Sequence, residues 1–410
     1  INISLAAAVS VATNTINNTV LAHILDSSLN SGGALNISAT SDKDIDALGI
    51  SLAVAVSAGG GTFGLSGAVG VAQATNTIGG LVQSLIADAD TADGQSILTG
   101  GAINILTDND STIDATLVVI AASIAAGSGT INISLAGAAS VSSNTITSAV
   151  LAGISNSKVD VTGGVMIDAN ANSMINANTV AVGVAVTAGG TLSLAGAVGV
   201  AQATNIIGGS TQAIITGGSE VMATEKVALV VDDKASIISN AVAAAISVSV
   251  STGVSGALSV SVTLAENSIT GSSRAAIDGS SVTTTDTLQD VTVDAMAMNN
   301  IESVAVAASI ALAASSGGLS LAGSGAGASA RNITTNQVLS EIIDSTVTAT
   351  GAVSTMLTDM STIKSDTASA AVSIGISSGA ALSGAVAVTI AENQIGGTYR
   401  ATITNSTVDA

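Results

Sequence analysis

Apolar and polar residues alternate along parts of this chain with the two-residue period of a β-strand. Residues 34–47, ALNISATSDKDIDA, begin with this alternation and contain a concentration of charged residues. Because successive side chains of a strand point to opposite faces, we expect this segment to be a strand with one solvated face. No segment keeps the 3.6-residue apolar period of a helix over more than two turns, so little helix is expected.

Two uncharged segments rich in Ala, Val, Gly and Ser follow, at 49–58 (GISLAVAVSA) and at 63–75. The glycines at 59–61 separate them and supply the conformational freedom that a chain reversal needs. We call these two segments the arms. Small and apolar residues at successive positions predict that the arms are buried on both faces, as in the central strands of layered sheets. After Asn76, the segment 81–88 (LVQSLIAD) is expected to resume an alternating strand.

The same pattern repeats along the whole chain. An Asn that follows an apolar arm recurs at intervals of 62, 68, 61, 62, 65 and 61 residues, and an Ile in the charged strand recurs at intervals of 68, 62, 63, 63 and 62. The two series of repeated positions are Asn14, Asn76, Asn144, Asn205, Asn267, Asn332 and Asn393, and Ile45, Ile113, Ile175, Ile238, Ile301 and Ile363. Agreement between two independent series predicts stacked repeats in which equivalent positions lie above one another.

Alternate repeats resemble each other more than neighbouring repeats do. TFGLSGAVGVAQATNTIGG at 62–80 returns as TLSLAGAVGVAQATNIIGG at 191–209, 129 residues later. We therefore expect one continuous β-repeat array over residues 1–410, forming a fragment of a longer periodic protein. Its approximate units are 1–32, 33–99, 100–162, 163–224, 225–287, 288–349 and 350–410.

The predicted fold is all-β, a repetitive β-solenoid of about seven units of about 62 residues, with a layered core of Ala, Gly, Val and Ser. One coil per unit gives a rise of ~34 Å at ~4.8 Å per coil, whereas three coils of ~21 residues per unit would give ~95 Å. Burial of both faces of the arms favours the wide coil. A stack of antiparallel hairpins with the same small-residue core is the main structural alternative.

Composition and charge narrow the class of protein. The chain is 47% hydrophobic but contains no Trp, Pro or Cys, and Phe63 and Tyr399 are its only aromatic residues, so its core must be thin. A formal net charge of −20 disfavours nucleic acid and anionic membrane surfaces as partners. Residues 241–265 carry no charge, but their β-branched alternation with Ser, Thr and Gly predicts strand, so no membrane span is expected.

Few residues offer chemistry. The repeated Asn is expected to form a structural ladder, because amide side chains in register can hydrogen-bond along a stack. His23, the single histidine, has no nucleophile motif or repeated acidic neighbour, so we expect no catalytic residues and no enzyme. The one metal candidate is DADTADG, where Asp88, Asp90 and Asp93 could offer oxygen ligands to Ca²⁺. It occurs once, and otherwise no cofactor is expected.

Uncharged arms followed by Asn-x-Ile and a glycine pair recur, as in AVGVAQATNTIGG at 68–80 and AVAVTIAENQIGG at 385–397. This repeated sequence pattern resembles that of giant repetitive surface and filament proteins of bacteria, namely leukotoxin-like filamentous adhesins of fusobacteria and, more distantly, filamentous haemagglutinins. The resemblance covers essentially the whole chain and implies export, a long parent protein and a role in fibres or adhesion.

The expected function is that of a structural component of an extracellular bacterial filament or surface fibre, stiffened by stacked in-register sheets. Its expected partners are other copies of itself or further repeats of the same chain. The alternative is an adhesin stalk or binding module, with a cell-surface or glycan ligand recognised by polar turns that vary between units, such as SDKDID. We expect an extracellular or cell-surface location, although these residues include no signal peptide.

Overall fold

The computed structural model describes residues 1–89 and 96–410, and this part of the chain consists of β-strands and turns without helix. The strands form three sheets. Sheet A contains the long strands β1 (Asn2–Leu25), β4 (Phe63–Ala87), β7 (Ile131–Ser155), β10 (Leu192–Thr216), β13 (Val254–Asp278), β16 (Leu319–Ile343) and β19 (Ala380–Thr404). Sheet C contains the long strands β3 (Leu35–Ala58), β6 (Ile103–Ala126), β9 (Val165–Ala188), β12 (Val227–Ser251), β15 (Val291–Ser315) and β18 (Val353–Ser377). Sheet B contains the short strands β2 (Leu29–Ser31), β5 (Ile97–Thr99), β8 (Lys158–Val161), β11 (Glu220–Ala223), β14 (Ser281–Thr284), β17 (Thr346–Thr348) and β20 (Thr407–Asp409).

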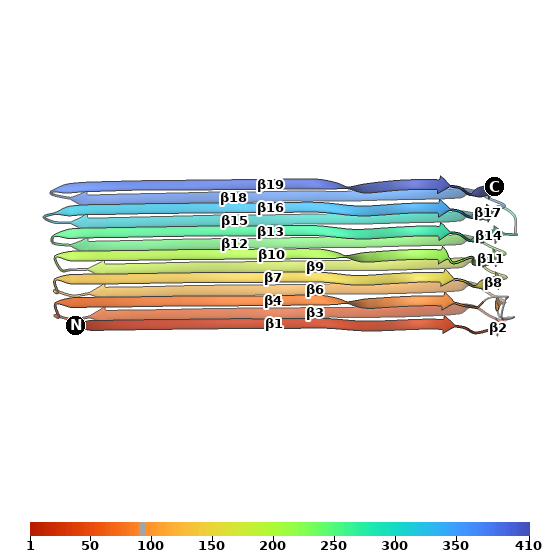
Figure 1. Ribbon diagram of the computed structural model, residues 1–410, viewed down its shortest axis with the longest axis horizontal. Coiled ribbons are helices and arrows are strands. Elements are labelled where there is room, and N and C mark those ends of the chain that lie inside the picture. The colour runs from red at the N-terminus through yellow and green to blue at the C-terminus, as the bar shows by residue number, and fades with distance from the viewer. Residues whose placement is uncertain (90–95) are drawn as a thin grey trace.

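The chain runs from a sheet A strand through a short sheet B strand to a sheet C strand, and then returns through a tight turn to sheet A. Figure 1 shows the resulting coils stacked in chain order, with long, nearly straight strands. Neighbouring strands of each sheet come from successive coils and pair in parallel, for example β1 with β4 and β3 with β6. The predicted β-solenoid with one wide coil per repeat is therefore confirmed, and parallel pairing excludes the stack of antiparallel hairpins.

Sheets A and C face each other, and the side chains that point between them make up most of the buried residues. Along β3 every second residue is buried and its neighbours are exposed, so Leu48 is 65% exposed and Ile50 is 63% exposed. The prediction that the arms are buried on both faces is wrong. The coil contributes two layers, and no third layer of the described chain covers their outer faces.

The core differs between the two halves of the long strands. In the half nearest the turn between sheets C and A, the buried residues are mostly Ala and Ser, such as Ala68, Ala121 and Ala243. In the other half they are Ile and Val, and the short strands of sheet B close the core with residues such as Val159 and Val282. Small side chains allow close approach of the two sheets, which keeps dispersion contacts dense without aromatic residues.

A glycine pair bends the sheet A strands β4 and β10 where the arm ends. Gly80 has φ 112° and Gly209 has φ 123°, values that residues with a Cβ rarely adopt. A Cβ on Gly80 would lie 1.9 Å from the backbone O of Asn18, and a Cβ on Gly209 would lie 2.1 Å from the backbone O of Ser148. Both the backbone conformation and the contact with the adjacent coil therefore require glycine here.

Candidate functional site

The repeated Asn forms an uninterrupted ladder through the interior. All seven residues point between the sheets and lie in register on neighbouring strands of sheet A. Asn14 Nδ2 donates to Asn76 Oδ1 at 2.8 Å, and the same bond is repeated from each Asn to the next as far as Asn393. Each interior amide thus satisfies the next one, which is how buried polar side chains avoid a desolvation cost.

The structure contains the predicted isoleucine ladder, except that one of its six members is Ile237 and not Ile238. Ile45, Ile113 and Ile175 lie in register on sheet C, and the row continues through Ile237, Ile301 and Ile363. The assignment of Ile238 to this row is wrong. Ile238 is the next residue along β12 and points to the outer face, where it pairs with Asn176 and Glu302.

Polar and charged residues line the interior opposite the glycine bend. Lys43 is 2% exposed, and its Nζ donates to Asn109 Oδ1 at 3.0 Å and to Ser148 Oγ at 3.3 Å. Desolvation lowers the pKa of Lys43. Asp233 lines a cavity of about 20 Å³ together with Asn109, which is room for about one water molecule. Sequence reasoning missed this interior polar row.

Asp233 is held as a buried carboxyl. Ser273 Oγ donates to Asp233 Oδ2 at 2.7 Å. Burial raises the pKa of Asp233 above its ordinary value of 3.8, and the hydrogen bonds from Ser273 and Thr211 oppose part of that rise. The Ser273 contact joins β12 to β13 through the interior, so it links the two facing sheets at this point.

The metal candidate is only partly described. Asp90 and Asp93 lie outside the described residues. Asp88 follows β4 in a left-handed conformation with φ 57°, as Asp26 and Asn156 do at the equivalent turns of the adjacent coils. Asn156 Nδ2 donates to Asp88 Oδ1 at 2.9 Å. Within residues 1–89 and 96–410, no group of three or more His, Asp or Glu side chains could hold a metal ion.

The single histidine lies on the outer part of the first coil. His23 Nε2 is 3.1 Å from Gln83 Oε1, a hydrogen bond to the adjacent coil. Leu85 is its register partner, so the histidine position is not repeated. This contact gives His23 a structural role at the edge of sheet A.

An ionic cluster near the sheet B end of sheet A was not predicted. Glu341 is 2% exposed and forms ion pairs with Arg274, at 3.2 Å between Oε2 and Nε, and with Arg400. Arg274 also pairs with Asp278 at 2.8 Å. Burial alone would lower the pKa of Arg274, but the hydrogen bonds that Arg274 donates to Asp278 and Glu341 outweigh burial and raise that pKa. The cluster ties together three successive coils.

The outer face of sheet C is acidic in the half nearest sheet B. Asp42 and Asp110 are register partners on adjacent strands, and Asp46 and Asp114 are another such pair. Burial, and then the charge of Asp110, raises the pKa of Asp108. Stacked like charges destabilise a sheet, and here they also oppose association of this face with other acidic surfaces.

The ends of the stack are open. Among the described strands, β1 pairs with β4 alone in sheet A, and β19 pairs with β16 alone. Core residues of the last coil are consequently exposed, and outer residues such as Val388 and Ile390 are 51% and 57% exposed. An unpaired row of backbone groups invites pairing with another strand.

The comparisons with known proteins leave this architecture without an identified relative. No family model, no curated protein and no solved structure matches the chain. A search of the described residues finds no helix that is both long and apolar enough to cross a membrane. The chain is thus defined by its fold, a wide parallel β-solenoid with interior amide and isoleucine ladders.

Proposed function

We propose that this chain is a structural component of an extracellular bacterial filament or surface fibre, extended by stacking further coils onto its ends. The observation that carries the proposal is the complementarity of those ends. Along the Asn ladder every Nδ2 donates toward the C-terminal coil, from Asn14 to Asn393. Asn14 Oδ1 and Asn393 Nδ2 have no partner among the described residues, so one end offers an acceptor and the other a donor.

Extension would repeat the contacts already present inside the stack. A further coil placed ~4.8 Å beyond β19 would continue sheets A, B and C in the same parallel register. It would cover the exposed core of the last coil and give Asn393 its acceptor. The incoming coil is proposed to come from another copy of the chain or from further repeats of the same chain. A composition without Cys is compatible with a location outside the cell, since folding then needs no particular redox state.

The test compares two single substitutions in the last coil. Asn393→Asp places a carboxylate, which can only accept, against the acceptor Oδ1 of Asn14 in the next copy. Gln394→Asp adds the same charge at the next residue of β19, which is on the outer face. An unmet hydrogen bond of this kind costs about 1–3 kcal/mol, so N393D is expected to raise the critical concentration for filament growth about tenfold or more.

Electron microscopy and fibre diffraction give the decisive readouts. Filaments of the unaltered chain are expected to show an axial repeat of ~4.8 Å and to grow in the Q394D variant nearly as well. A chain that stays a soluble monomer at high concentration would contradict the proposal. Equal loss of filament growth in N393D and Q394D would show that the added charge, and not the Asn ladder, controls the end-to-end association of copies.

A second candidate, an adhesin stalk or binding module, is favoured by one irregular turn. Between β14 and β15 the chain forms a longer connection at 285–290, in which Leu288 is 83% exposed with φ 58°. The other described connections between sheets B and C are shorter, so this turn varies between units as a recognition turn would. Replacement of 285–290 by the shorter turn 224–226 would abolish binding to host-cell or glycan arrays if this turn recognised a ligand, and would leave filament growth unchanged.

A further inference from the structure

The outer face of sheet A is apolar and uncharged over the half of each strand nearest the turn. In β13, β16 and β19 the first charged residues of sheet A are Glu266, Arg331 and Glu392, which lie in one row. Before this row the outward residues are Leu, Val, Ile, Ala and Gly with the single polar residue Ser329, while the inward residues are Ala, Ser and Thr. The larger apolar side chains therefore face outward, which is the reverse of the usual arrangement in a water-exposed sheet.

One row of this face alternates leucine and glycine over its first six strands and ends with a second glycine. The register places its members in the order Leu5, Gly67, Leu135, Gly196, Leu258, Gly323 and Gly384. The leucines are 74%, 55% and 59% exposed in chain order. Leucines two coils apart are separated by ~9.6 Å, with a position lacking a side chain between them. The similarity of alternate repeats in the sequence thus corresponds to leucine side chains that project from alternate strands of this face.

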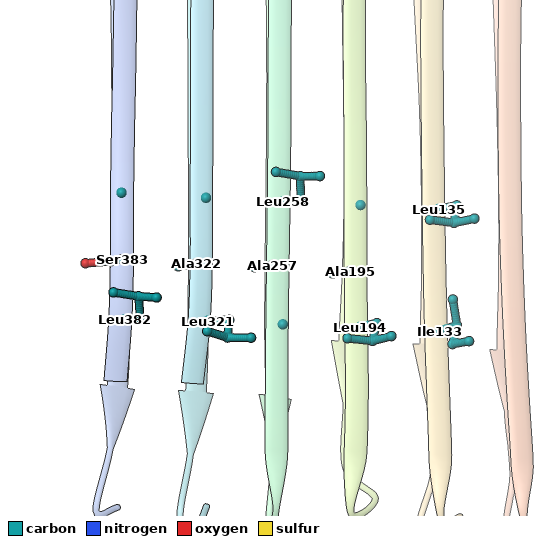
Figure 2. Close-up of a pocket in the computed structure, with 14 residues that line it drawn as sticks. Ile133, Leu135, Leu194, Ala195, Ala257, Leu258, Leu321, Ala322, Leu382 and Ser383 are labelled. Carbon is teal, nitrogen blue, oxygen red and sulfur yellow. The ribbon is translucent and has the colours of Figure 1, made fainter. Parts of the chain in front are cut away.

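The leucines lie along the sheet and leave grooves beside them. A Cβ on Gly67 would be 2.9 Å from Leu5 Cδ2, and a Cβ on Gly196 would be 3.0 Å from Leu135 Cδ2, so each leucine leans over the adjacent glycine. Figure 2 shows Leu135 and Leu258 in one row, with Leu194 and Leu321 in the row nearer the turn. Two apolar grooves of about 670 and 730 Å³ run across this face.

The area is sufficient for a stable contact. Seven strands at ~4.8 Å and twelve residues at ~3.3 Å give a face of roughly 34 by 40 Å, or about 1,300 Å². A standard protein interface buries about 800 Å² on each partner.

We propose that the outer face of sheet A packs face to face on the same face of a second copy of this chain. A copy displaced by one coil, ~4.8 Å, places its leucines out of line with those of the first, so that they enter the apolar grooves beside them. Lipid is the less suitable occupant, because an acyl surface needs no alternation of leucine and glycine and a net charge of −20 opposes anionic membranes. This lateral pairing is separate from end-to-end stacking and does not depend on it.

The outer face of sheet C supplies the control. It is also apolar near the turn, but its outward rows contain no glycine, for example Val54, Ala122, Val184, Ile246, Ile310 and Val372. Leu52 and Ile310 are 60% and 41% exposed there. The double variant Leu52→Ser, Ile310→Ser therefore removes comparable exposed apolar surface from the opposite side of the molecule.

The experiment is sedimentation of the full chain carrying Asn393→Asp, which limits stacking, with and without each pair of serine substitutions. We expect a dimer that Leu135→Ser with Leu258→Ser weakens at least 100-fold, about 2.8 kcal/mol, and that the sheet C variant leaves unchanged. Filaments are compared in chains that keep Asn393. There the Leu135→Ser, Leu258→Ser pair should halve the mass per unit length of the filaments and leave their length unchanged. Sheet A variant filaments that keep their full mass per length would contradict lateral pairing, whereas an unaltered chain that forms dimers but no filaments would contradict stacking alone.

Three further outcomes would overturn the pairing. The first is a monomer at every concentration up to about 100 µM. The second is a dimer that survives the sheet A substitutions or is lost with the sheet C substitutions. The third is a chain that stays monomeric but floats with neutral phosphatidylcholine vesicles, an interaction that the sheet A substitutions abolish. Circular dichroism of each variant would show that the β-structure is retained, so that a lost dimer reports on the interface.

Discussion

Ile237 and Ile238 are consecutive residues of β12 with opposite environments. Ile237 has no exposed surface and lies in register between Ile175 and Ile301, whereas Ile238 points to the outer face. A strand turns successive side chains to opposite faces, so a shift of one residue exchanges core for surface. The buried row, and not the presence of isoleucine, is what stabilises each coil.

Truncation of these two neighbours should therefore have unequal effects. Ile237→Ala leaves a cavity inside a closely packed stack and is expected to cost about 2–5 kcal/mol. Ile238→Ala removes an outward side chain and is expected to cost less than about 1 kcal/mol. Urea unfolding followed by circular dichroism measures both. Similar losses in the two variants would contradict the register that places Ile237 in the core.

Loss of one amide from the middle of the Asn ladder should cost more than loss of one at its end. Asn205→Ala leaves Asn144 Nδ2 without its acceptor and Asn267 Oδ1 without its donor, whereas Asn14→Ala affects only Asn76. Each unsatisfied buried group costs about 1–3 kcal/mol. We expect N205A to unfold at clearly lower urea concentration than N14A. A ladder of little energetic importance would give the same midpoint for both.

A carboxyl in the ladder should make stability depend on pH. In Asn205→Asp the ionised group can accept from Asn144 but cannot donate to Asn267, and burial disfavours its charge. The pKa of the carboxyl introduced at position 205 is therefore expected to be raised above the ordinary ~3.9 in the folded variant. The variant is then most stable at low pH, and its stability falls as pH rises from ~3.9 through the raised pKa. The difference between N205D and the unaltered chain, measured from pH 3 to pH 7, should widen with pH. A constant difference would contradict this.

The ladders could be predicted because their residues recur at one interval and have a clear physical role. The burial of the arms could not be inferred in the same way, since Ala, Val and Ser on both faces suit either a buried or an exposed sheet. Counting in steps of two from Asn76 would have placed Ala74, Ala72 and Ala68 inside and Val69 and Val71 outside. The same count along β12 would have selected Ile237.

The ionic cluster was not predicted because its partners lie on adjacent coils but are not register partners. Arg274 and Glu341 are separated by 67 residues, and Glu341 and Arg400 by 59. Neither interval equals the repeat, since each pair joins positions two residues apart in register, as Arg274 pairs with Leu339 on the adjacent strand. Diagonal contacts of this kind follow from the register, which has to be known first.

The glycine bend should tolerate no side chain. Gly209→Ala would introduce a Cβ 2.1 Å from the backbone O of Ser148 at φ 123°, so strain alone is expected to cost about 1–3 kcal/mol. Gly137→Ala is the matched control, because a Cβ there meets nothing within 4 Å. Thermal unfolding should show a lowered midpoint for G209A and little change for G137A. An unchanged midpoint in G209A would mean that the adjacent coils shift freely at this point.

Neutralisation of Glu341 should destabilise the chain more than neutralisation of an exposed glutamate. Glu341→Gln leaves Arg274 and Arg400 with weaker acceptors, and the buried position makes that loss worth about 1–2 kcal/mol after allowance for the partly exposed arginines. Glu392→Gln is the control, since Glu392 is 57% exposed and lies 3.4 Å from Arg331. Its cost should be below about 1 kcal/mol. Equal unfolding midpoints in the two variants would show that the ionic cluster does not stabilise the chain more than an exposed ion pair does.

The whole chain should become more stable as pH falls from 7 toward 4. Five carboxyls have pKa values raised above the ordinary 3.8, with desolvation as the first cause in each: Asp108, Asp168, Asp233, Asp294 and Asp359. A raised folded pKa means that the folded state binds more protons than the unfolded state in this range, so stability declines as pH rises through it. The fall in net negative charge acts in the same direction.

Thermal unfolding between pH 4 and pH 8 measures this dependence, and the highest midpoint is expected at the acidic end. Asp233→Asn is the informative variant, because an amide can still accept from Ser273 but carries no charge. Its midpoint should vary less with pH than that of the unaltered chain and exceed it at pH 7. A midpoint that rises with pH in the unaltered chain would show that ion pairs such as Arg274–Glu341 outweigh the desolvated carboxyls.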